Sequence, residues 1–297
     1  MPKAADARPV DVLQRGRERV ISAWDLGGAV VDPGPESRIE TLLEGLSEQP
    51  RALLLTHIHL DHAGAAGALA ERFPDIEVWV HERGAPHLAD PSRLLASAER
   101  IYGEELEELW GRVAAVPEGN LRVLRGGETI TAAARELDVE YTPGHASHHV
   151  VYFDRSDGTA FMGDVAGVRI PPSDFVRPPT PPPDIDIEAW KRSVDRVAAR
   201  RPTRMALTHF GTVDDPPPHL AQMKLRLDQQ AELARELLER HGDAPEAADA
   251  FVAEVNRWTR EGAGEAAAVF EVGAPVEQMW LGLRRYWRKR AEGAATR

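Results

Sequence analysis

Short apolar runs alternate with amphipathic stretches through the first part of the chain. The runs at 52–55 and 204–207 are a few residues long, as expected for buried strands. Residues 36–46 place Ile39, Leu42 and Leu43 on one face of a helix. Further strands are predicted at 20–24, 29–32, 76–80, 121–124, 136–141, 149–153 and 159–162, and further helices at 65–72, 92–115 and 187–200. This alternation is typical of an α/β fold.

The pattern changes from about residue 216 onward. Long stretches rich in Ala, Leu, Glu and Arg then follow helical spacing, with breaks near 242–243 and 262–264. We therefore predict a first domain over residues 1–212 and an all-helical C-terminal extension over residues 213–297. Trp280, Leu283 and Trp287 lie on one face of a predicted helix. That face is expected to pack the extension onto the first domain or onto a second subunit.

A proline-rich segment lies between these two regions, at residues 171–183. It contains seven prolines. Proline lacks a backbone N–H and has a fixed φ, so the segment is predicted to be neither helix nor central strand. We expect a stiff loop that runs over the surface.

Composition excludes several classes of protein. The 297 residues carry a formal net charge of −12, which argues against a protein that works mainly by neutralising nucleic-acid phosphates. The absence of cysteine excludes disulfides, thiolate zinc sites and cysteine nucleophiles. There is no signal-peptide pattern at the start and no apolar run long enough to span a membrane. We expect a soluble, cytoplasmic protein.

A dense cluster of possible metal ligands follows the apolar run at 52–55. His57, His59, Asp61 and His62 lie within the segment THIHLDH. In an extended segment the side chains of residues i and i+2 point to the same side, so His57 and His59 can hold one ion together. Asp61 and His62 follow as the chain turns and can reach a second ion. Imidazole nitrogens and carboxylate oxygens are ligands that zinc and related metals prefer.

Three later fragments repeat this arrangement of an apolar strand followed by a ligand-type residue. His145 follows the strand predicted at 136–141, within the sequence TPGH. Asp164 follows the strand at 159–162 in FMGD, and His209 follows the strand at 204–207 in LTHFG. Residues at strand ends lie on one rim of a sheet, where the scaffold holds them rigidly. The sequence therefore predicts that these seven residues form a metal site, with room for two metals.

These motifs, in this order, resemble the metallo-β-lactamase superfamily. The resemblance covers about residues 9–212 and rests on HxHxDH, GH, GD and the final strand-end His. It implies an αββα sandwich for the first domain, which would be catalytic. GGETI at 126–130 and HASHHVVYF at 145–153 are similar to segments of the glyoxalase-II-like branch. The C-terminal extension resembles that of an uncharacterised prokaryotic branch.

The resemblance also implies how the ligands divide between two ions. The first ion would be held by His57, His59 and His145. The second would be held by Asp61, His62 and His209, and Asp164 would bridge the two ions. The full set of expected ligands is His57, His59, Asp61, His62, His145, Asp164 and His209. Two supporting residues are expected beside them. Asp32, in the VDPG turn, matches the DxG position of the family, and His149 is expected to support the ligands without binding metal.

The substrate-binding wall is expected after Asp164, where this family builds it. Arg169 is a candidate for contacting an anionic group, and Phe175 is a candidate for an apolar floor. The chain lacks the Lys/Arg-Phe stretch of glyoxalase-II enzymes. It also lacks the tyrosine that follows the bridging Asp in the acyl-homoserine-lactonase branch.

These observations lead to one main hypothesis and two alternatives. The main one is a metal-dependent hydrolase with two Zn²⁺ ions, or Fe or Mn in their place, in which Asp61 is the catalytic residue. Its partner would be a small ester, thioester or lactone, with no nucleic acid and no membrane, and assembly into a homo-oligomer is left open. A mononuclear-iron persulfide dioxygenase is the first alternative, since that branch shares the same motifs. A non-catalytic metal-binding protein is the second.

Overall fold

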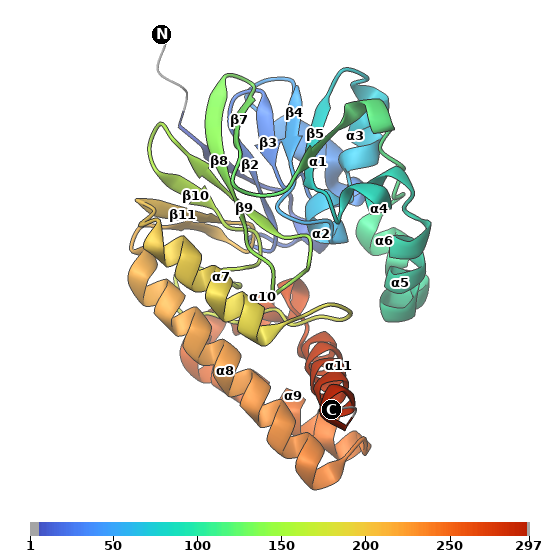
Figure 1. Ribbon diagram of the computed structural model, residues 1–297, viewed down its shortest axis with the longest axis vertical. Coiled ribbons are helices and arrows are strands. Elements are labelled where there is room, and N and C mark those ends of the chain that lie inside the picture. Colours follow the sequence, from blue (N-terminus) through green and yellow to red (C-terminus); the bar gives the residue numbers. More distant parts are fainter. Residues whose placement is uncertain (1–5, 296–297) are drawn as a thin grey trace.

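Two sheets form the centre of the molecule (Figure 1). The computed structural model describes residues 6–295. The first sheet has the strand order β1-β2-β3-β4-β5-β6, and the second has the order β12-β11-β10-β9-β8-β7. The first sheet consists of β1 (Arg8–Asp11), β2 (Ser22–Asp25), β3 (Ala29–Val31), β4 (Ala52–Leu54), β5 (Glu77–His81) and β6 (Leu121–Leu124). The second consists of β7 (Thr129–Ala132), β8 (Arg135–Tyr141), β9 (Val150–Asp154), β10 (Thr159–Phe161), β11 (Arg204–Leu207) and β12 (Gly211–Val213).

Strand β4 shows how the sequence produces these layers. Alternate side chains of a strand point to opposite faces of its sheet. Leu53 packs into the core between the first sheet and its helices, whereas Ala52 and Leu54 pack into the core between the two sheets. Both faces of β4 are therefore buried, which explains its continuous apolar run. Strand β4 pairs in parallel with β3 and β5, so the carboxyl ends of these strands meet at one edge.

Helices cover the outer face of each sheet. The first sheet carries α1 (Ile39–Gly45), α2 (Leu60–Ala63), α3 (Ala66–Arg72), α4 (Ala85–Ala89), α5 (Ser92–Tyr102) and α6 (Leu106–Trp110). The second sheet is covered by α7 (Ile187–Ala199) and by α8 (Pro216–His241) of the C-terminal extension. The αββα sandwich with an all-helical extension is thus confirmed.

The C-terminal extension shares a hydrophobic core with the second sheet. It continues from α8 through α9 (Pro245–Ala263), α10 (Ala267–Gly273) and α11 (Val276–Ala295). One buried cluster runs from Val151 and Met205 of the sheet to Phe251 and Trp280 of the extension. Leu283 is fully buried in the same cluster. The predicted apolar face of α11 therefore packs onto the chain's own sandwich, and the extension is tied to the sheet by continuous apolar contact.

Two local predictions were wrong. Residues 92–115 do not form one helix, because Gly103 and Gly111 adopt positive φ and divide the segment into α5, α6 and a non-helical stretch. The proline-rich segment does not simply run over the surface. Residues 175–180 are buried, and the Arg177 side chain is 1% exposed. That guanidinium lies among α9 and α10, where it donates to Thr259 Oγ1 and to the Ala274 carbonyl.

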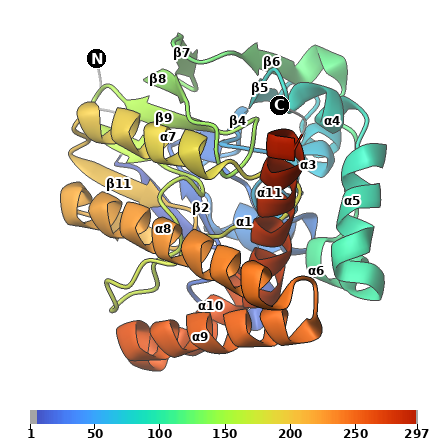
Figure 2. The ribbon, with the colours of Figure 1, turned by 60° about the horizontal axis from the view of Figure 1, so that its bottom comes forward.

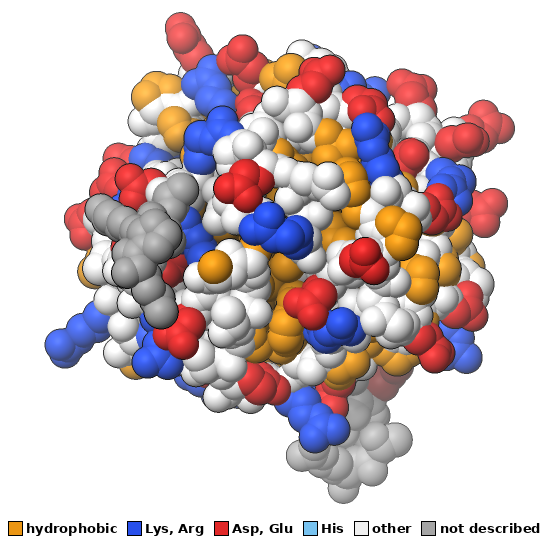
Figure 3. Space-filling view, turned by 90° about the horizontal axis from the view of Figure 1, so that it is seen from above, with side chains coloured by type: hydrophobic (Ala, Val, Ile, Leu, Met, Phe, Trp, Pro, Cys, Tyr) orange, Lys and Arg blue, Asp and Glu red, His pale blue; other side chains and the backbone are white. Residues whose placement is uncertain are grey.

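The outer surface carries charges of both signs. On the face seen from above in Figure 3, Asp and Glu side chains are interspersed with Lys and Arg. Among the helices of residues 6–295, none is long and apolar enough to cross a membrane.

Candidate metal centre

The structure brings the seven predicted ligand residues together at one edge of the two sheets. Their possible ligand atoms form three overlapping groups, within each of which all atoms lie within 4.8 Å of one another. The groups are His57, His59 and His145; His57, His62 and Asp164; and Asp61, His62 and His209. Four of these residues come from the loop and short helix after β4, and the other three from loops after β8, β10 and β11. Strands β10 and β11 are parallel, so their carboxyl ends lie at the same edge.

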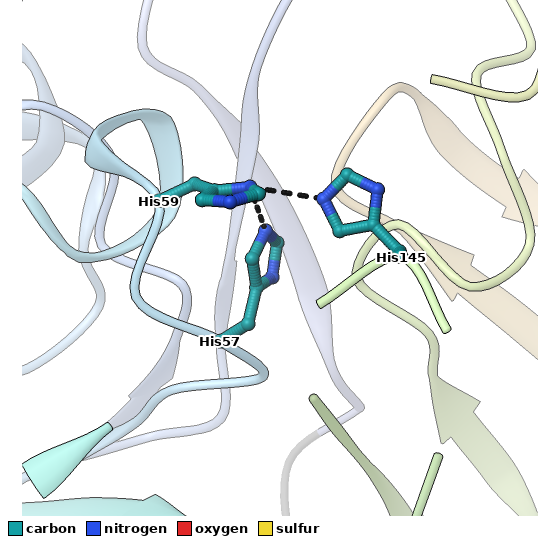
Figure 4. A group of neighbouring side chains, drawn as sticks. All are labelled: His57, His59 and His145. Atoms are coloured by element: carbon teal, nitrogen blue, oxygen red, sulfur yellow. Dashed lines mark hydrogen bonds between the residues drawn. The ribbon is translucent and has the colours of Figure 1, made fainter. Parts of the chain in front are cut away.

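The first group consists of three histidines whose ring nitrogens converge (Figure 4). His57 Nε2 lies 3.0 Å from His59 Nδ1, and His145 Nε2 lies 2.9 Å from the same atom. Each of the three residues can offer one ligand atom such that all three atoms lie within 4.8 Å of one another. Such a trio supplies the imidazole ligands that a zinc-type ion requires.

The second group lies beside the first and contains a carboxylate and two histidines. Asp61 Oδ2 lies 3.2 Å from His209 Nε2 and 3.6 Å from His62 Nε2. Both histidine rings are buried, whereas the Asp61 side chain is 21% exposed. The carboxylate therefore faces both the two rings and the space through which a substrate would enter.

Asp164 lies between the two groups and turns one oxygen toward each. Its Oδ2 is 3.4 Å from His145 Nε2, and its Oδ1 is 3.2 Å from His62 Nε2. Gly163, directly before it, has φ +49°, and an added Cβ would lie 2.4 Å from Thr56 Oγ1. Only glycine fits this close approach, and it lets the chain aim Asp164 between the two groups.

The nitrogen that each of four histidines turns away from the cluster contacts a fixed oxygen atom. His57 Nδ1 contacts Thr56 Oγ1 at 3.1 Å, and His62 Nδ1 contacts an Asp32 carboxylate oxygen at 2.8 Å. His145 Nδ1 and His209 Nδ1 contact backbone carbonyls at 3.0 and 2.6 Å. An acceptor on one ring nitrogen leaves the other free of its proton, which is the form that binds a metal.

Asp32 and His149 lie where supporting residues are expected. Asp32 is fully buried and accepts hydrogen bonds from the backbone N–H of Thr56 and from the hydroxyls of Thr56 and Thr208, all at 2.8 Å. His149 Nε2 accepts from the backbone N–H of Asp164 at 3.2 Å. Asp32 thus orients His62, and His149 fixes the backbone of Asp164.

Two buried atoms of the cluster indicate that the residues fit a metal. His62 Nε2 and Asp164 Oδ1 are buried and make no hydrogen bond within residues 6–295, although they lie 3.2 Å apart. Their other close neighbours are ligand atoms too, since His62 Nε2 lies 3.6 Å from Asp61 Oδ2 and Asp164 Oδ1 lies 3.6 Å from His209 Nε2. Both atoms point into the second group, where an ion would satisfy them. The donor set of nitrogens and carboxylate oxygens suits zinc and its transition-metal neighbours.

The protonation states of the first group also suit metal binding. Burial, reinforced by neighbouring imidazoles, lowers the pKa of His57 well below its ordinary value and that of His59 to about 3. Burial also lowers the pKa of His145. The three rings are therefore neutral at physiological pH, as metal ligands must be.

The second group holds opposite charges close together. Burial opposes ionisation of Asp61, but His62 and His209 outweigh it and lower its pKa to about 2. Burial opposes ionisation of Asp164 as well, yet three neighbouring histidines hold its pKa well below the ordinary range. For His62, burial is outweighed by three carboxylates, which raise its pKa well above the ordinary value. Without metal, His62 therefore carries a proton that compensates for the carboxylates.

Comparison with known proteins identifies the family. A family model described as the metallo-beta-lactamase superfamily matches residues 25–209, which include all seven clustered residues and Asp32. The chain belongs to the metallo-beta-lactamase superfamily.

Two curated relatives agree with this assignment. The chain is 28% identical over 176 residues to the metallo-beta-lactamase fold-containing protein ST1585 of Sulfurisphaera tokodaii, which covers 58% of this chain and 65% of that protein. It is 32% identical over 136 residues to the hydroxyacylglutathione hydrolase of Thermosynechococcus vestitus, which covers 46% of this chain and 42% of that protein. The matched segments thus span less than two thirds of either relative.

A solved structure resembles the whole chain, extension included. It is the metallo-beta-lactamase family protein TTHA1429 from Thermus thermophilus, with a TM-score of 0.68 and 23% identity. The similarity covers 98% of this chain and 95% of that one. The combination of sandwich and helical extension is therefore a fold that this superfamily uses.

Proton competition gives a prediction for this superfamily member. An ion in the second group must displace the proton on His62, so its affinity should weaken as pH falls. Burial opposes protonation of His209 as well, but Asp164 and Asp61 raise its pKa, so we expect roughly a tenfold loss of affinity per pH unit for each proton that the ion displaces. Metal titrations with a competing chelator between about pH 8 and about pH 6 measure this slope. A pH-independent affinity would mean that His62 is not a ligand.

The cavity beside the cluster corrects the predicted substrate wall. A cavity of about 500 Å³ reaches His59, Asp61 and Asp164, and neither Arg169 nor Phe175 lines it. The Arg169 guanidinium pairs with Asp174 at 2.6 Å. Phe175 is buried at 6% exposure and packs edge to face on Phe270 of α10. Phe175 therefore packs against the C-terminal extension, and Arg169 is held by Asp174 and the Thr212 carbonyl, so neither side chain faces the cavity.

The actual walls come from two regions that sequence reasoning did not connect with the site. One wall is the helical segment α5–α6, and the other is α10 and α11 of the extension. A Cβ built on Gly273 of α10 would lie 3.8 Å from His209 Nδ1, so the extension reaches the metal cluster itself. The apolar spacing of α5 was visible in the sequence, but the same spacing also suits a helix that faces protein.

Proposed function

We propose that this protein is a metal-dependent hydrolase that holds two ions, most simply Zn²⁺, and cleaves a small ester, thioester or lactone. The observation that carries the proposal is Asp164, whose two oxygens turn toward two separate groups of ligand atoms. The match to a hydroxyacylglutathione hydrolase also supports a hydrolytic reaction. The cytoplasmic location expected from the composition remains a prediction.

The residues divide into two ion sites under this proposal. His57, His59 and His145 would hold the first ion, and Asp61, His62 and His209 would hold the second, with Asp164 shared. When bound, such a pair of ions polarises a scissile carbonyl and lowers the pKa of water toward about 7. No serine or cysteine nucleophile is then required.

Asp61 would position the attacking water. Its carboxylate is ionised because its pKa is about 2, so it accepts a hydrogen bond and does not donate one. It lines the cavity next to His59. In the reaction the water oxygen forms a bond to the acyl carbon and the bond from that carbon to the leaving oxygen or sulfur breaks. One proton of the water ends on the leaving alcohol or thiol, and the products are that compound and a carboxylic acid.

One preparation tests the proposal through metal content and a substrate panel. We expect about two equivalents of zinc and turnover of esters, thioesters or lactones. A chelator should abolish that turnover, and added Zn²⁺ should restore it. Stoichiometric iron with oxygen uptake on a persulfide, and no hydrolysis, would replace the proposal with the dioxygenase alternative. Fully loaded protein that turns over nothing in the panel would favour a binding role.

The second ion site can be tested alone with His209→Ala. The variant loses one ligand nitrogen at the edge of the cluster, so bound metal should fall from two equivalents toward one. Elemental analysis after dialysis measures this. His219→Ala is a matched control, because His219 is also a buried histidine, but it lies on α8 and contacts the Ala166 carbonyl. This control should keep both equivalents. Two equivalents retained by His209→Ala would show that the second site is assigned wrongly.

A further inference from the structure

The cavity at the metal cluster is formed by parts of the chain that lie far apart in the sequence. Its floor includes His59, Asp61 and Asp164, and its sides are α5 and α6, α10 and α11, and the prolines at 181–183. Figure 2 shows α11 on the side of the molecule that faces α5 and α6. The site and the cavity are continuous, so whatever fills the cavity also contacts the cluster.

The α5 wall is an apolar stripe. Leu94, Ala98 and Ile101 recur at helical spacing and all line the cavity. An apolar helical face normally packs against protein, yet Leu94 and Ile101 keep part of their surface exposed toward the cavity. Exposed apolar surface that lines a concave site is typical of ligand binding.

The opposite wall is apolar as well. Val272, Pro275 and Met279 of the C-terminal extension line it. Of the other charged residues that line the cavity, Arg15, Arg17 and Glu105 are exposed to solvent, and Glu271 is paired with the buried Arg177. An anionic or peptide-like group placed deep between the two apolar walls would lose its hydration without gaining a charged partner, which is costly.

Each of the two walls also carries a polar side chain. Tyr102 lies on α5 and Gln278 lies on α11. Both residues line the cavity. The helical segment and the C-terminal extension therefore each contribute a polar side chain as well as apolar ones to this cavity.

We propose that this cavity binds an apolar chain of the substrate, so that the ester or thioester cleaved here carries a hydrocarbon or aromatic group. The inference rests on the proposed hydrolase function and names the substrate class for it. The chain lies between the α5 stripe and the extension, and the scissile carbonyl lies at Asp61 and Asp164. The C-terminal extension is then a wall of the active site that determines substrate specificity.

Two thioester series test this on zinc-loaded protein. In one, the acyl group lengthens from acetyl to decanoyl on a constant small thiol; in the other, the thiol lengthens on a constant acetyl group. We expect kcat/KM to rise roughly fourfold per added methylene in one series until the cavity is full. The series that responds shows which side of the scissile bond the cavity holds. Hydrolysis of both series with no dependence on chain length would overturn the proposal.

Variants that fill the cavity give a matched comparison. Ile101→Trp places a larger ring on the α5 stripe and should lower kcat/KM for the longest reactive substrate at least about tenfold more than kcat/KM for the acetyl thioester. Leu94→Trp, on the same stripe, is a second variant should the first fold poorly. Leu225→Trp adds the same ring on α8, where Leu225 is 56% exposed, and should change neither rate. Equal loss for short and long substrates would contradict a role for the stripe in chain binding.

Binding measured without turnover separates this proposal from the proposed function. Octanoate and acetate carry the same carboxylate and differ only in their hydrocarbon chain. Calorimetry should therefore show octanoate binding zinc-loaded protein at least about tenfold more tightly than acetate. The difference should disappear in Ile101→Trp. If no panel substrate is hydrolysed but octanoate is still preferred, the hydrolase function fails and the apolar site stands. Equal affinity for the two acids would overturn the apolar site.

Discussion

Replacing Asp61 with alanine is expected to lower kcat/KM about 10²–10⁴-fold, the range found for removal of a group that acts on the reacting proton. The carboxylate contacts His209 Nε2 at 3.2 Å and lines the cavity, so the variant loses a ligand of the second ion and the acceptor that orients water. The fold should persist, because the side chain is 21% exposed and its removal leaves a hole that water can enter. Steady-state kinetics in excess zinc and a thermal melt measure the two effects.

Asp61→Asn separates the charge of this residue from its shape. The amide occupies the same volume but is a weaker ligand and a poorer acceptor. The asparagine side chain should fill the space that alanine leaves empty, so the thermal stability should match that of the unmodified protein. Most of the loss in kcat/KM should remain. Turnover close to that of the unmodified protein in either variant, with two ions bound, would refute the role assigned to Asp61.

The metal cluster was predictable because its core is local in sequence. His57, His59, Asp61 and His62 follow strand β4 directly, so extended geometry and one turn of helix fix their relative positions. The distant members were predictable for a different reason. Each follows a buried strand, and strand ends meet at one edge of a sheet, as the parallel pairing of β10 with β11 shows.

The cavity walls were not predictable, because the same pattern serves two purposes. The spacing of Leu94, Ala98 and Ile101 specifies an apolar face of α5 but does not say whether protein or ligand covers it. That depends on where α10 and α11 lie, and their position is set by a core shared with the second sheet. Tertiary packing across the whole chain therefore decides the substrate site.

The misplaced wall has the same cause. Phe175 follows Asp164 closely in sequence, but a buried arginine two residues after Phe175 holds this part of the chain against the extension. Arg177 is 1% exposed, lies 2.9 Å from a Glu271 carboxylate oxygen and donates to Thr259 Oγ1. Burying a guanidinium is costly unless it is paired, and all these partners belong to the C-terminal extension. The proline-rich segment is thus held to α9 and α10, and Phe175 is carried with it.

Asp32 is where substitution should affect stability most. Its carboxylate accepts hydrogen bonds from Thr56, Thr208 and His62, all of which are buried. The backbone of Asp32 has a φ of +50°. Asp32→Ala leaves these donors without an acceptor and places alanine in the left-handed region, so we expect a loss of about 3–5 kcal/mol in the free energy of unfolding. Chemical denaturation measures this. A loss below about 1 kcal/mol would show that water or the neighbouring groups replace the carboxylate.

Asp32→Asn should remove the second ion with a smaller loss of stability, because asparagine tolerates positive φ and keeps the volume of the side chain. The new amide N–H faces His62 Nδ1, so that nitrogen must accept a hydrogen bond and carries no proton. The neutral ring then carries its proton on Nε2, and this blocks the atom that would bind the metal. Bound zinc should therefore fall from two equivalents toward one. Thr208→Val is the control, since it removes one hydrogen bond to Asp32 without altering the tautomer of His62, and it should retain both ions. Two ions retained in Asp32→Asn would mean that the Asp32 carboxylate does not set the tautomer through which His62 reaches the cluster.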